Sequence, residues 1–331
     1  MKKDDYLFAV AHKKHRFLSF RINKKCILVS VTLRYIKRKD IDCKRWDEVI
    51  KNSRSPFIYG LSWYLDCVTN KNWDAIILDD YQAIMPLPFN TKLFGIPQLY
   101  QPPFTQQLGV FSQMSKIDVE TFIQAIPEKF RKRQIALNHS NHLAESTQRT
   151  NLVVDLNLSR ESIVANFSSS VRKRLRKMDG YSIFESKDVS GLIDLYRNEL
   201  GHKVNLNNST YDLAFELFQK VIEKNAGKIY VLEKDGEIVA RGAFYECFNR
   251  VINVFAANNS SEPNAMTKLL SEVMFIHSNL EKVFDFEGSD IPGVKSYFLS
   301  FGSYEQNYSE YHFNKMPTLV NQLLKLRRNS V

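Results

Sequence analysis

The chain has 331 residues, more than one hydrophobic core usually supports, since single cores stop growing at roughly 250–300 residues. Apolar residues make up 44% of the sequence and charged residues 25%, which excludes a disordered or fibrous protein. The net charge of +10 is concentrated at the start: residues 1–51 hold 15 basic and 6 acidic residues, whereas the other 280 hold 31 and 30, so charge alone is poor evidence for specific nucleic-acid binding.

Motifs of the common enzyme classes are missing from the sequence. With 12 glycines in the chain, there is no G-x-G-x-x-G, no Walker-type phosphate loop, no G-x-S-x-G and no H-E-x-x-H. The four cysteines lack C-x-x-C spacing, so we expect neither a disulfide framework nor a zinc site, and we expect a reducing, cytoplasmic location. No apolar run approaches the roughly 18 residues of a membrane span.

Residues 1–31 differ from the rest of the chain. They are basic, show no clear periodicity and end in one apolar, strand-like run. We expect a basic N-terminal extension, either a flexible tail or the product of an over-extended start site.

From residue 32 onward, short β-rich runs alternate with helical stretches, as is typical of an α/β or α+β fold. Within residues 32–150, the apolar spacing predicts helices at 40–52, 58–69 and 118–130, and a hairpin at 73–88.

The second half of the chain shows the same kinds of element. Apolar residues at intervals of three and four over 163–178 predict one helix, with Ser159 as its N-cap, and Asp235-Gly236 predicts a tight hairpin turn within 227–244. The other predicted elements are strands at 151–156, 251–256, 283–287 and 304–313, and helices at 189–199, 211–224, 265–280 and 291–301.

The two hairpins align with each other. The run 77–85 matches 231–239 in pattern, and each hairpin follows two helices and has an acidic turn. This predicts a duplicated unit of helix, helix, hairpin, strand, helix and strand, although two α/β domains can share such a hairpin by chance.

Several segments resemble a known family. The run Val283-Phe-Asp-Phe-Glu-Gly-Ser289, followed by 291–302, resembles the C-terminal signature of Fem-type acyltransferases, which consist of two tandem GNAT-like domains. Residues 151–156 with 166–177 resemble the start of their second domain, and residues 100–111 are similar to a first-domain segment of bacterial relatives. The resemblance spans about 32–315 and implies an α/β fold with mixed sheets, divided into GNAT-like domains at 32–150 and 151–331.

The resemblance also implies an N-acyltransferase. Its co-substrate would be an acyl-CoA or an aminoacyl-tRNA, with no permanently bound cofactor, and its acceptor an amine such as that of a peptidoglycan precursor. GNAT enzymes hold the CoA pyrophosphate with a glycine-containing loop at a helix N-terminus. The matching stretch, 256–265, has no glycine but has Glu262 and Pro263, which favours the Fem-type branch. Against that branch, 181–226 leaves no room for the helical arm of some Fem proteins.

Donor-binding residues expected from this comparison are Ala256, Asn258, Ser289 and Lys295. Ser289 and Asp290 precede Pro292, so they equally suit a helix N-cap, and a lysine such as Lys295 is usually solvated.

Two acidic residues are the catalytic candidates. Asp285 and Glu287 alternate along one strand, so both side chains point to one face, and because Phe284 and Phe286 occupy the core face, we expect the carboxylates to point toward a cleft or solvent. Glu287, at the strand end, is the candidate general base for an attacking amine. The alternative is that it caps the next helix or pairs with Lys295.

A basic cluster lies at 172–177, off the apolar stripe of its helix. Arg172, Arg174 and Arg176, with two lysines between them, suit a polyanionic ligand such as tRNA or a nucleotide-linked wall precursor. The alternative is a solvated charged face.

Aromatic and amide side chains surround a Pro-Pro turn near residue 102. We expect Trp63, Tyr100, Phe104 and Gln107 to line an acceptor groove, and the alternative is a structural loop over the first sheet. His139, His142 and Glu145 are spaced three apart, but a fourth ligand is missing, so we expect no metal site.

The resemblance to Fem-type acyltransferases, taken with these patterns, implies an N-acyl or aminoacyl transferase that acts by direct amine attack. The alternative is a non-enzymatic protein that kept the fold and binds a polyanionic or carbohydrate partner. The sequence does not indicate an oligomeric state. An open groove shared by Asp285, Glu287 and Lys295 favours the enzyme, and burial of these residues in ion pairs favours the alternative.

Overall fold

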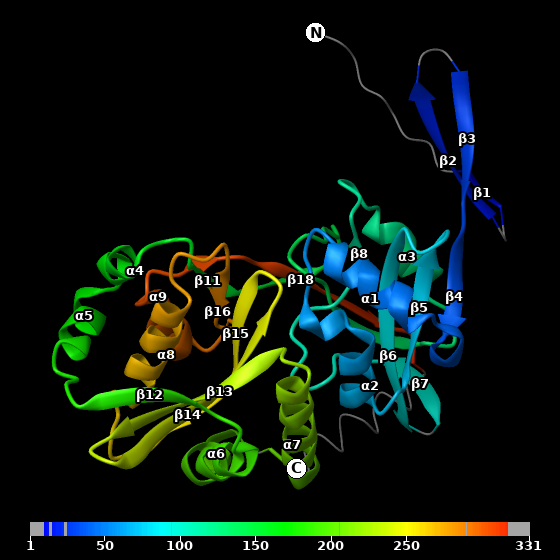
Figure 1. Cartoon of the computed structure of the whole chain (residues 1–331). Coiled ribbons are helices and arrows are strands. Elements are labelled where there is room, and N and C mark those ends of the chain that lie inside the picture. Colours follow the sequence, from blue (N-terminus) through cyan, green and yellow to red (C-terminus); the bar gives the residue numbers. More distant parts are fainter. Residues whose placement is uncertain are drawn as a thin grey trace.

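The computed structural model describes residues 10–12, 15–22, 25–93, 95–204, 206–288 and 290–316. Two lobes lie side by side, each a β-sheet with helices packed on it (Figure 1). Three strands precede them in the chain and form a separate antiparallel sheet, β1 (Val10–His12), β2 (His15–Ile22) and β3 (Lys25–Val31), which projects from the first lobe (Figure 1).

The first lobe contains a sheet ordered β4-β5-β6-β7, with β8 also paired to β6. Its elements are β4 (Leu33–Lys37), η1 (Arg38–Asp40), α1 (Cys43–Asn52), η2 (Ile58–Gly60), α2 (Ser62–Thr69), β5 (Trp73–Leu78), β6 (Ala83–Leu93), β7 (Ile96–Leu99), β8 (Phe111–Ser112), α3 (Val119–Ala125) and β9 (Lys132–Ala136).

The second lobe contains a sheet of seven strands ordered β12-β13-β14-β15-β16-β11-β17, antiparallel except for the β15–β16 pair. Its strands are β11 (Leu152–Asp155), β12 (Tyr181–Ser186), β13 (Gly227–Lys234), β14 (Glu237–Cys247), β15 (Arg250–Asn258), β16 (Val283–Asp285) and β17 (Tyr304–Glu305). Its helices are α4 (Arg160–Asn166), α5 (Ser169–Leu175), α6 (Val189–Val204), α7 (Asn208–Glu223), α8 (Ala265–Ile276) and α9 (Pro292–Leu299).

The repeat predicted from the two hairpins is present. Apart from β7, which lies between β6 and β8 and has no counterpart, the order α1, α2, β5–β6, β8, α3, β9 in the first lobe recurs as α6, α7, β13–β14, β15, α8, β16 in the second. The second hairpin turns at Asp235-Gly236 with both residues at positive φ, as a two-residue turn requires.

One strand crosses between the lobes. β18 (Tyr308–Asn314) pairs with β9 and with β10 (Thr147–Arg149), although it follows the elements of the second lobe in the chain (Figure 1). We propose that the two units divide near residue 150, as the sequence predicts, with β18 returning to the first.

The two faces of the second sheet are buried differently. One face packs against α4, α5, α8 and α9 and includes Phe284 and Phe286. The other face, with Tyr245 and Phe255, shares one continuous core with aromatic residues of the first lobe such as Tyr59. The first lobe, together with α6 and α7, therefore covers this face of the second sheet.

The helix predicted over 163–178 is wrong in one respect, because it is two helices. Ser159 caps α4 as predicted, but Ser168 caps α5, accepting a hydrogen bond from the Val171 N–H at 3.3 Å. The Ser168 N–H donates to the Ser300 carbonyl at 2.8 Å, and the first helix therefore ends before this residue. The apolar stripe is kept, since Ile163 and Val171 are both fully buried.

No helix among the described residues is long and apolar enough to cross a membrane.

Candidate functional site

The parallel strands of the second sheet part at their carboxyl ends. β15 and β16 pair from Arg250 with Val283 to Ile252 with Asp285, after which β15 continues to Asn258 without β16 beside it. Ligands of open α/β sheets bind outside the carboxyl ends of parallel strands where such strands diverge. The opening between β15 and β16 is therefore the first place to look for a site.

Glu287 lies just past the end of β16, on the face that the first lobe covers. Its φ is +58°, and its carboxyl accepts a hydrogen bond from the hydroxyl of Tyr59, which is fully buried in the first lobe. Gln106, also from the first lobe, donates to the Glu287 carbonyl. Burial, with a smaller contribution from the nearby Asp285 charge, raises the pKa of Glu287 to about 8. A carboxyl with that pKa can both take and return a proton near neutral pH.

Asp285 does not face a cleft, so the prediction that both carboxylates are open is wrong for this residue. Its side chain is 1% exposed and pairs with Arg250, itself 4% exposed, at 2.6 Å. Its other oxygen accepts from the Glu287 N–H at 2.8 Å. The strand predicted over 283–287 ends at Asp285, so alternation does not extend to Glu287, and Arg250 covers the Asp285 carboxylate. Asp285 therefore fits a role in holding the backbone of Glu287.

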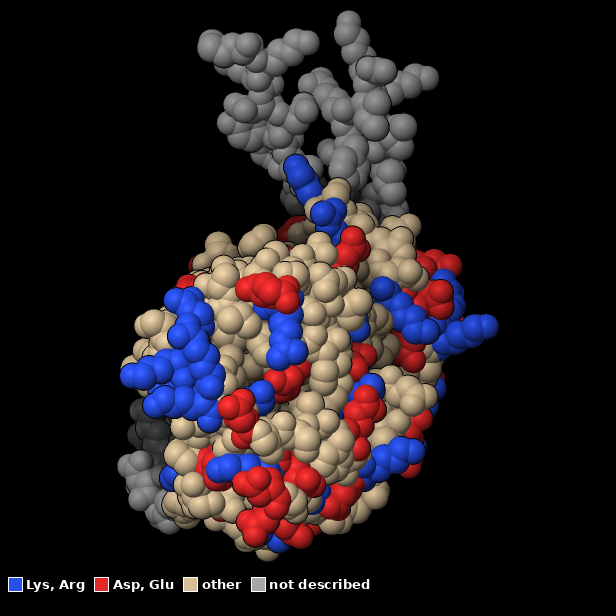
Figure 2. Space-filling model, turned by 60° about the vertical axis from the view of Figure 1, so that its left-hand side comes forward, with Lys and Arg blue, Asp and Glu red and all other residues tan. Residues whose placement is uncertain are grey.

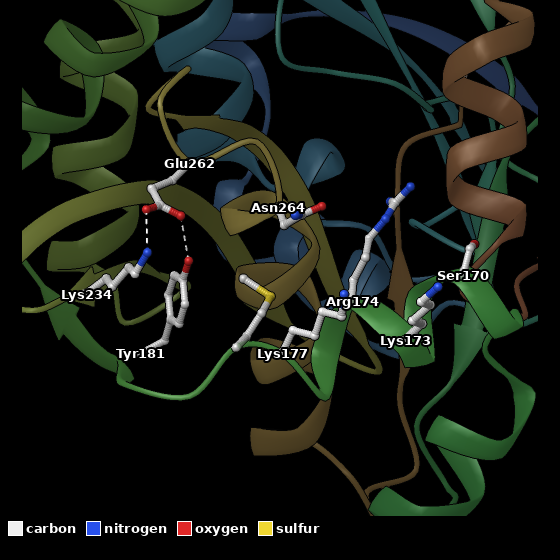
Figure 3. A pocket seen from close by; sticks show the side chains of 9 residues that line it. Ser170, Lys173, Arg174, Lys177, Tyr181, Lys234, Glu262 and Asn264 are labelled. Atoms are coloured by element: carbon white, nitrogen blue, oxygen red, sulfur yellow. Dashed lines mark hydrogen bonds and ion pairs between the residues drawn. The ribbon is translucent and has the colours of Figure 1, made fainter.

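On the opposite face, a cavity of about 500 Å³ lies between α5 and the loop that precedes α8 (Figure 3). Its lining is predominantly polar and rich in cations: Ser170, Lys173, Arg174, Lys177, Met178, Tyr181, Lys234, Glu262 and Asn264. In the described part of the chain, no acidic side chain pairs with Lys173, Arg174 or Lys177. Figure 2 shows Lys and Arg side chains gathered densely on the side of the molecule that carries α5. We call this cavity the basic pocket.

The acid of the basic pocket is held at one end of it. Glu262 accepts from Lys234 Nζ and from the Tyr181 hydroxyl, both at 2.6 Å (Figure 3). The Lys234 ammonium lowers the pKa of Glu262, so this carboxyl stays ionised and its charge is neutralised locally. The three remaining cations face the pocket without such a counter-charge.

The loop after β15 uses its own backbone donors. The N–H groups of Ser260, Ser261 and Glu262 donate to Glu199, to the Asn259 side chain and to the Asn259 carbonyl, respectively. A loop without glycine therefore offers few free N–H groups to phosphate, unlike a helix N-terminus arranged for anions.

The predicted donor-binding residues that the structure describes do not lie together in the basic pocket. Asn258 organises the loop, because its amide donates to the carbonyls of Asn259 and Glu262 at 2.9 and 3.1 Å, and Ala256 lies on β15. Ser289 lies outside the described residues. Lys295 does not line the basic pocket but pairs with Glu305 at 2.7 Å.

The predicted capping of the last helix is wrong. The N-cap of α9 is Ile291, which makes no side-chain capping bond, and Pro292 is at the start of the helix as expected. Asp290 instead pairs with Arg149 at 2.9 Å.

The three arginines of the basic cluster separate. Arg174 lines the basic pocket, whereas Arg172 donates to the carbonyls of Ala165 and Phe167 and so closes the end of α4. Arg176 is exposed and does not line the pocket. Sequence spacing identified the cluster correctly but not which of its members share one side of α5.

The predicted acceptor groove is largely packed. Phe104 lies between the lobes, 5.8 Å from the Phe218 ring centre, and Trp63 packs on the shared core. Tyr100 is partly buried, and burial raises the pKa of its hydroxyl. Gln107 is 0% exposed, so it cannot line an open groove. Its amide donates to the Gln106 side chain and accepts from the His139 N–H.

Metal binding has no support from the arrangement. Among the residues that the structure describes, no three His, Cys, Asp or Glu side chains are placed to hold a metal ion. His139 lies between the lobes, where its Nε2 is 3.2 Å from the Ser55 hydroxyl. Burial and the Arg250 charge lower the pKa of His139 to about 4, so it is neutral.

Sequence reasoning missed the first-lobe side of the site. Tyr59 and Gln106 reach Glu287 from segments far away in the chain, and no local pattern marks them. The sequence marks Tyr59 only as one tyrosine among other apolar residues, and Gln106 only as part of a Gln-Gln pair that follows a Pro-Pro turn.

No model of a known protein family matches the sequence, and no curated protein matches it. Solved structures do. FemX superposes with a TM-score of 0.59 at 10% identity, covering 83% of this chain and 97% of FemX. A conserved protein of unknown function from Bacteroides thetaiotaomicron gives 0.55 at 12% identity, covering 83% and 98%. The C-terminal domain of a candidate lysylphosphatidylglycerol synthetase from Agrobacterium fabrum gives 0.51 at 12% identity, covering 86% and 95%.

The protein therefore has the tandem GNAT-like fold of FemX, and the resemblance read from the sequence is confirmed at the level of the fold. At this identity the likeness concerns the fold alone, so donor, acceptor and roles have to be argued from the residues of this chain.

Proposed function

We propose that this protein is an N-acyltransferase that moves an acyl or aminoacyl group from a phosphate-bearing donor to an amine. The observation that carries the proposal is the basic pocket with its unpaired cations, which is lined from α5 and from the loop that follows β15.

The donor's phosphates are bound by side chains from α5. Ser170, Lys173, Arg174 and Lys177 recur at helical spacing, so they lie along one side of the segment over about two turns. Such a stripe suits phosphates spread along a backbone better than one compact pyrophosphate, which prefers converging N–H groups. We therefore favour an aminoacyl-tRNA donor over an acyl-CoA.

The acceptor amine approaches Glu287, whose side chain is partly exposed although the neighbouring Tyr59 is buried. An amine must lose a proton as it attacks the acyl carbonyl, and the Glu287 carboxylate is placed to take it. Direct attack needs no covalent enzyme intermediate, only a groove that holds both substrates in line. A peptidoglycan precursor with a free amine is the acceptor class we propose.

The test is transfer by the purified full chain. Radiolabelled aminoacyl-tRNA or acetyl-CoA is incubated with a nucleotide-linked peptidoglycan precursor that has a free amine, and base-stable amide product is counted. We expect transfer from the charged tRNA, with donor affinity that falls steeply as salt rises. Transfer from acetyl-CoA alone would reverse the donor assignment, and transfer from neither would contradict the enzyme function.

A second function is favoured by one observation. Asp285 is buried in its pair with Arg250 and Lys295 pairs with Glu305, so these residues and Glu287 do not share one open groove. We propose as the alternative a non-enzymatic protein that binds a polyanionic or carbohydrate partner through the basic pocket. Salt-dependent tRNA binding without any transfer, whether or not the tRNA is charged, is the result expected for it.

A further inference from the structure

A second, smaller cavity lies in the first lobe, and none of its lining residues belongs to the basic pocket. Its volume is about 70 Å³, and one water molecule needs at least about 10–15 Å³, so the cavity has room for a few waters or one small ion but not for a nucleotide. We call it the serine pocket, because serines from three separate segments line it: Ser53 and Ser55 after α1, Ser112 and Ser115 at β8 and the loop that follows it, and Ser140.

Among the described residues that line the serine pocket, Arg54 is the only charged one. Its backbone N–H donates to the Ser112 carbonyl at 3.0 Å, which holds the segment after α1 against β8. Its guanidinium forms no ion pair within the described part of the chain. An arginine presents several N–H donors in a rigid fork, and oxyanions are the ligands that this fork fits.

The serine pocket is open to solvent on one side. Arg54, Met114 and Ser115 are all exposed, and they form its rim. Its inner wall is buried, because Ser55 and Ser112 are only 5% and 6% exposed. A small ligand can therefore enter past the rim and reach polar groups that are shielded from bulk water.

The hydroxyl of Ser55 is a free donor on that inner wall. Burial and the Arg250 charge lower the pKa of His139 to about 4, so the imidazole is neutral and carries one proton. Arg250 Nη2 lies 3.5 Å from His139 Nδ1, and because a guanidinium only donates, Nδ1 is the acceptor and the proton is on Nε2. His139 Nε2 then donates to the Ser55 hydroxyl at 3.2 Å, which leaves the Ser55 proton to be donated elsewhere.

The two pockets take the same place in the repeat. The loop between β8 and α3 lines the serine pocket, and its counterpart in the second lobe, the loop between β15 and α8, lines the basic pocket through Glu262 and Asn264. Each lobe therefore has a pocket with an unpaired cation beside the loop that joins this strand to this helix. Their volumes of about 70 and 500 Å³ show that they do not take the same ligand.

We propose that the serine pocket binds a single phosphate group, with the Arg54 guanidinium donating from the rim and the Ser55 hydroxyl from the inner wall. The inference does not depend on the proposed acyl transfer. A tetrahedral oxyanion directs its oxygens to several sides, so it can accept from both groups at once, whereas the fork of a guanidinium alone already matches a planar carboxylate. The phosphate group belongs either to free inorganic phosphate or to a phosphate monoester whose remainder lies outside the rim.

The test is isothermal titration calorimetry with inorganic phosphate at constant ionic strength. The parent is the full chain with Lys173→Ala and Arg174→Ala, two exposed substitutions that weaken phosphate binding by the basic pocket. We expect saturable binding to this parent. Adding Arg54→Ala or Ser55→Ala should weaken it roughly 10–100-fold, as is typical when a hydrogen bond to a charged group is lost. Glycerol 3-phosphate should compete for the same site, and the tighter of the two ligands identifies the source of the phosphate group.

Arg131→Ala is the matched control, because Arg131 is also an exposed arginine of the first lobe and lines neither pocket. It should leave phosphate affinity unchanged. The inference is overturned if the parent shows no saturable binding, if Arg54→Ala binds phosphate as tightly as the parent, or if Arg131→Ala weakens binding equally. Acetate binding as tightly as phosphate would also overturn it. If Ser55→Ala does not fold, the exposed Arg54→Ala variant decides.

Discussion

The Tyr59 hydroxyl, in the first lobe, donates a hydrogen bond to the Glu287 carboxyl, in the second. The ring of Tyr59 is packed 5.6 Å from that of Tyr64 and 6.4 Å from that of Tyr245, within the core that both lobes share. The carboxyl is therefore positioned by a residue that only a docked first lobe can supply. This contact gives the packing of the lobes a direct effect on the chemistry of Glu287.

The first prediction concerns the pH dependence of transfer. Because the base must be ionised, wild-type kcat/KM should rise with pH and level off above about 8, where Glu287 has its pKa. The Tyr59 hydrogen bond lowers the pKa of Glu287, so Tyr59→Phe should move this rise to higher pH. Glu287→Gln should abolish it and reduce the rate by roughly 10²–10⁴-fold. Coincident profiles for wild type and Tyr59→Phe would disprove the coupling.

The second prediction concerns folding stability and the same carboxyl. Burial raises the pKa of Glu287 from its ordinary value of 4.5 to about 8, so the folded state holds its proton more tightly than the unfolded chain does. The associated stabilisation is complete below pH 4.5 and is lost as the pH rises toward 8. Urea unfolding of wild type and Glu287→Gln across this range should show the wild type losing stability relative to the variant. Parallel curves would mean that Glu287 is not protonated in the folded protein.

Local patterns explain how much of the fold could be predicted. The Asp235-Gly236 turn and the apolar alternation around it depend on neighbours in the chain, so the hairpin follows from sequence alone. The break between α4 and α5 does not, because the Ser168 N–H is bonded to Ser300, far along the chain. The return of β18 to β9 is likewise a contact between distant segments that no local spacing encodes.

For the candidate site, too, local patterns predicted individual residues but not the contacts between distant segments. The alternation expected over 283–287 predicted that Asp285 and Glu287 share a face, but β16 ends at Asp285, and alternation carries no information about what covers a face. Arg250 and Tyr59 cover it, and neither is marked by a motif. The basic cluster was visible as a charge run, whereas Lys234, which comes from β13, joins the basic pocket only through the fold.

The third prediction concerns the basic pocket. Lys173→Ala and Arg174→Ala should each weaken the binding of charged tRNA, and should make the dependence of log K on log salt shallower by about 0.7 for each lost phosphate contact with a single strand. Arg176→Ala is the control, because this cation is exposed and lies outside the pocket. Fluorescence titrations at several salt concentrations measure both quantities. An equal effect of all three substitutions would indicate non-specific attraction rather than a pocket.

The fourth prediction concerns the buried pair that holds the backbone of Glu287. Asp285→Ala leaves the Arg250 guanidinium, which is 4% exposed, without its partner at 2.6 Å. Removing one member of a buried pair typically costs about 3–5 kcal/mol, whereas replacing both with apolar residues costs far less. Urea unfolding should therefore show a large loss for Asp285→Ala and a smaller one for the double variant Asp285→Leu with Arg250→Met.

Lys295→Ala provides the comparison for this pair. It breaks a partly exposed bridge to Glu305, and such bridges contribute about 0–1 kcal/mol.

The Glu287 N–H also loses its acceptor in Asp285→Ala, so transfer should fall further than the lost stability explains. If the double variant kept full transfer activity, the Glu287 backbone would have to be held by Gln106 rather than by Asp285, because Gln106 bonds the carbonyl of that residue.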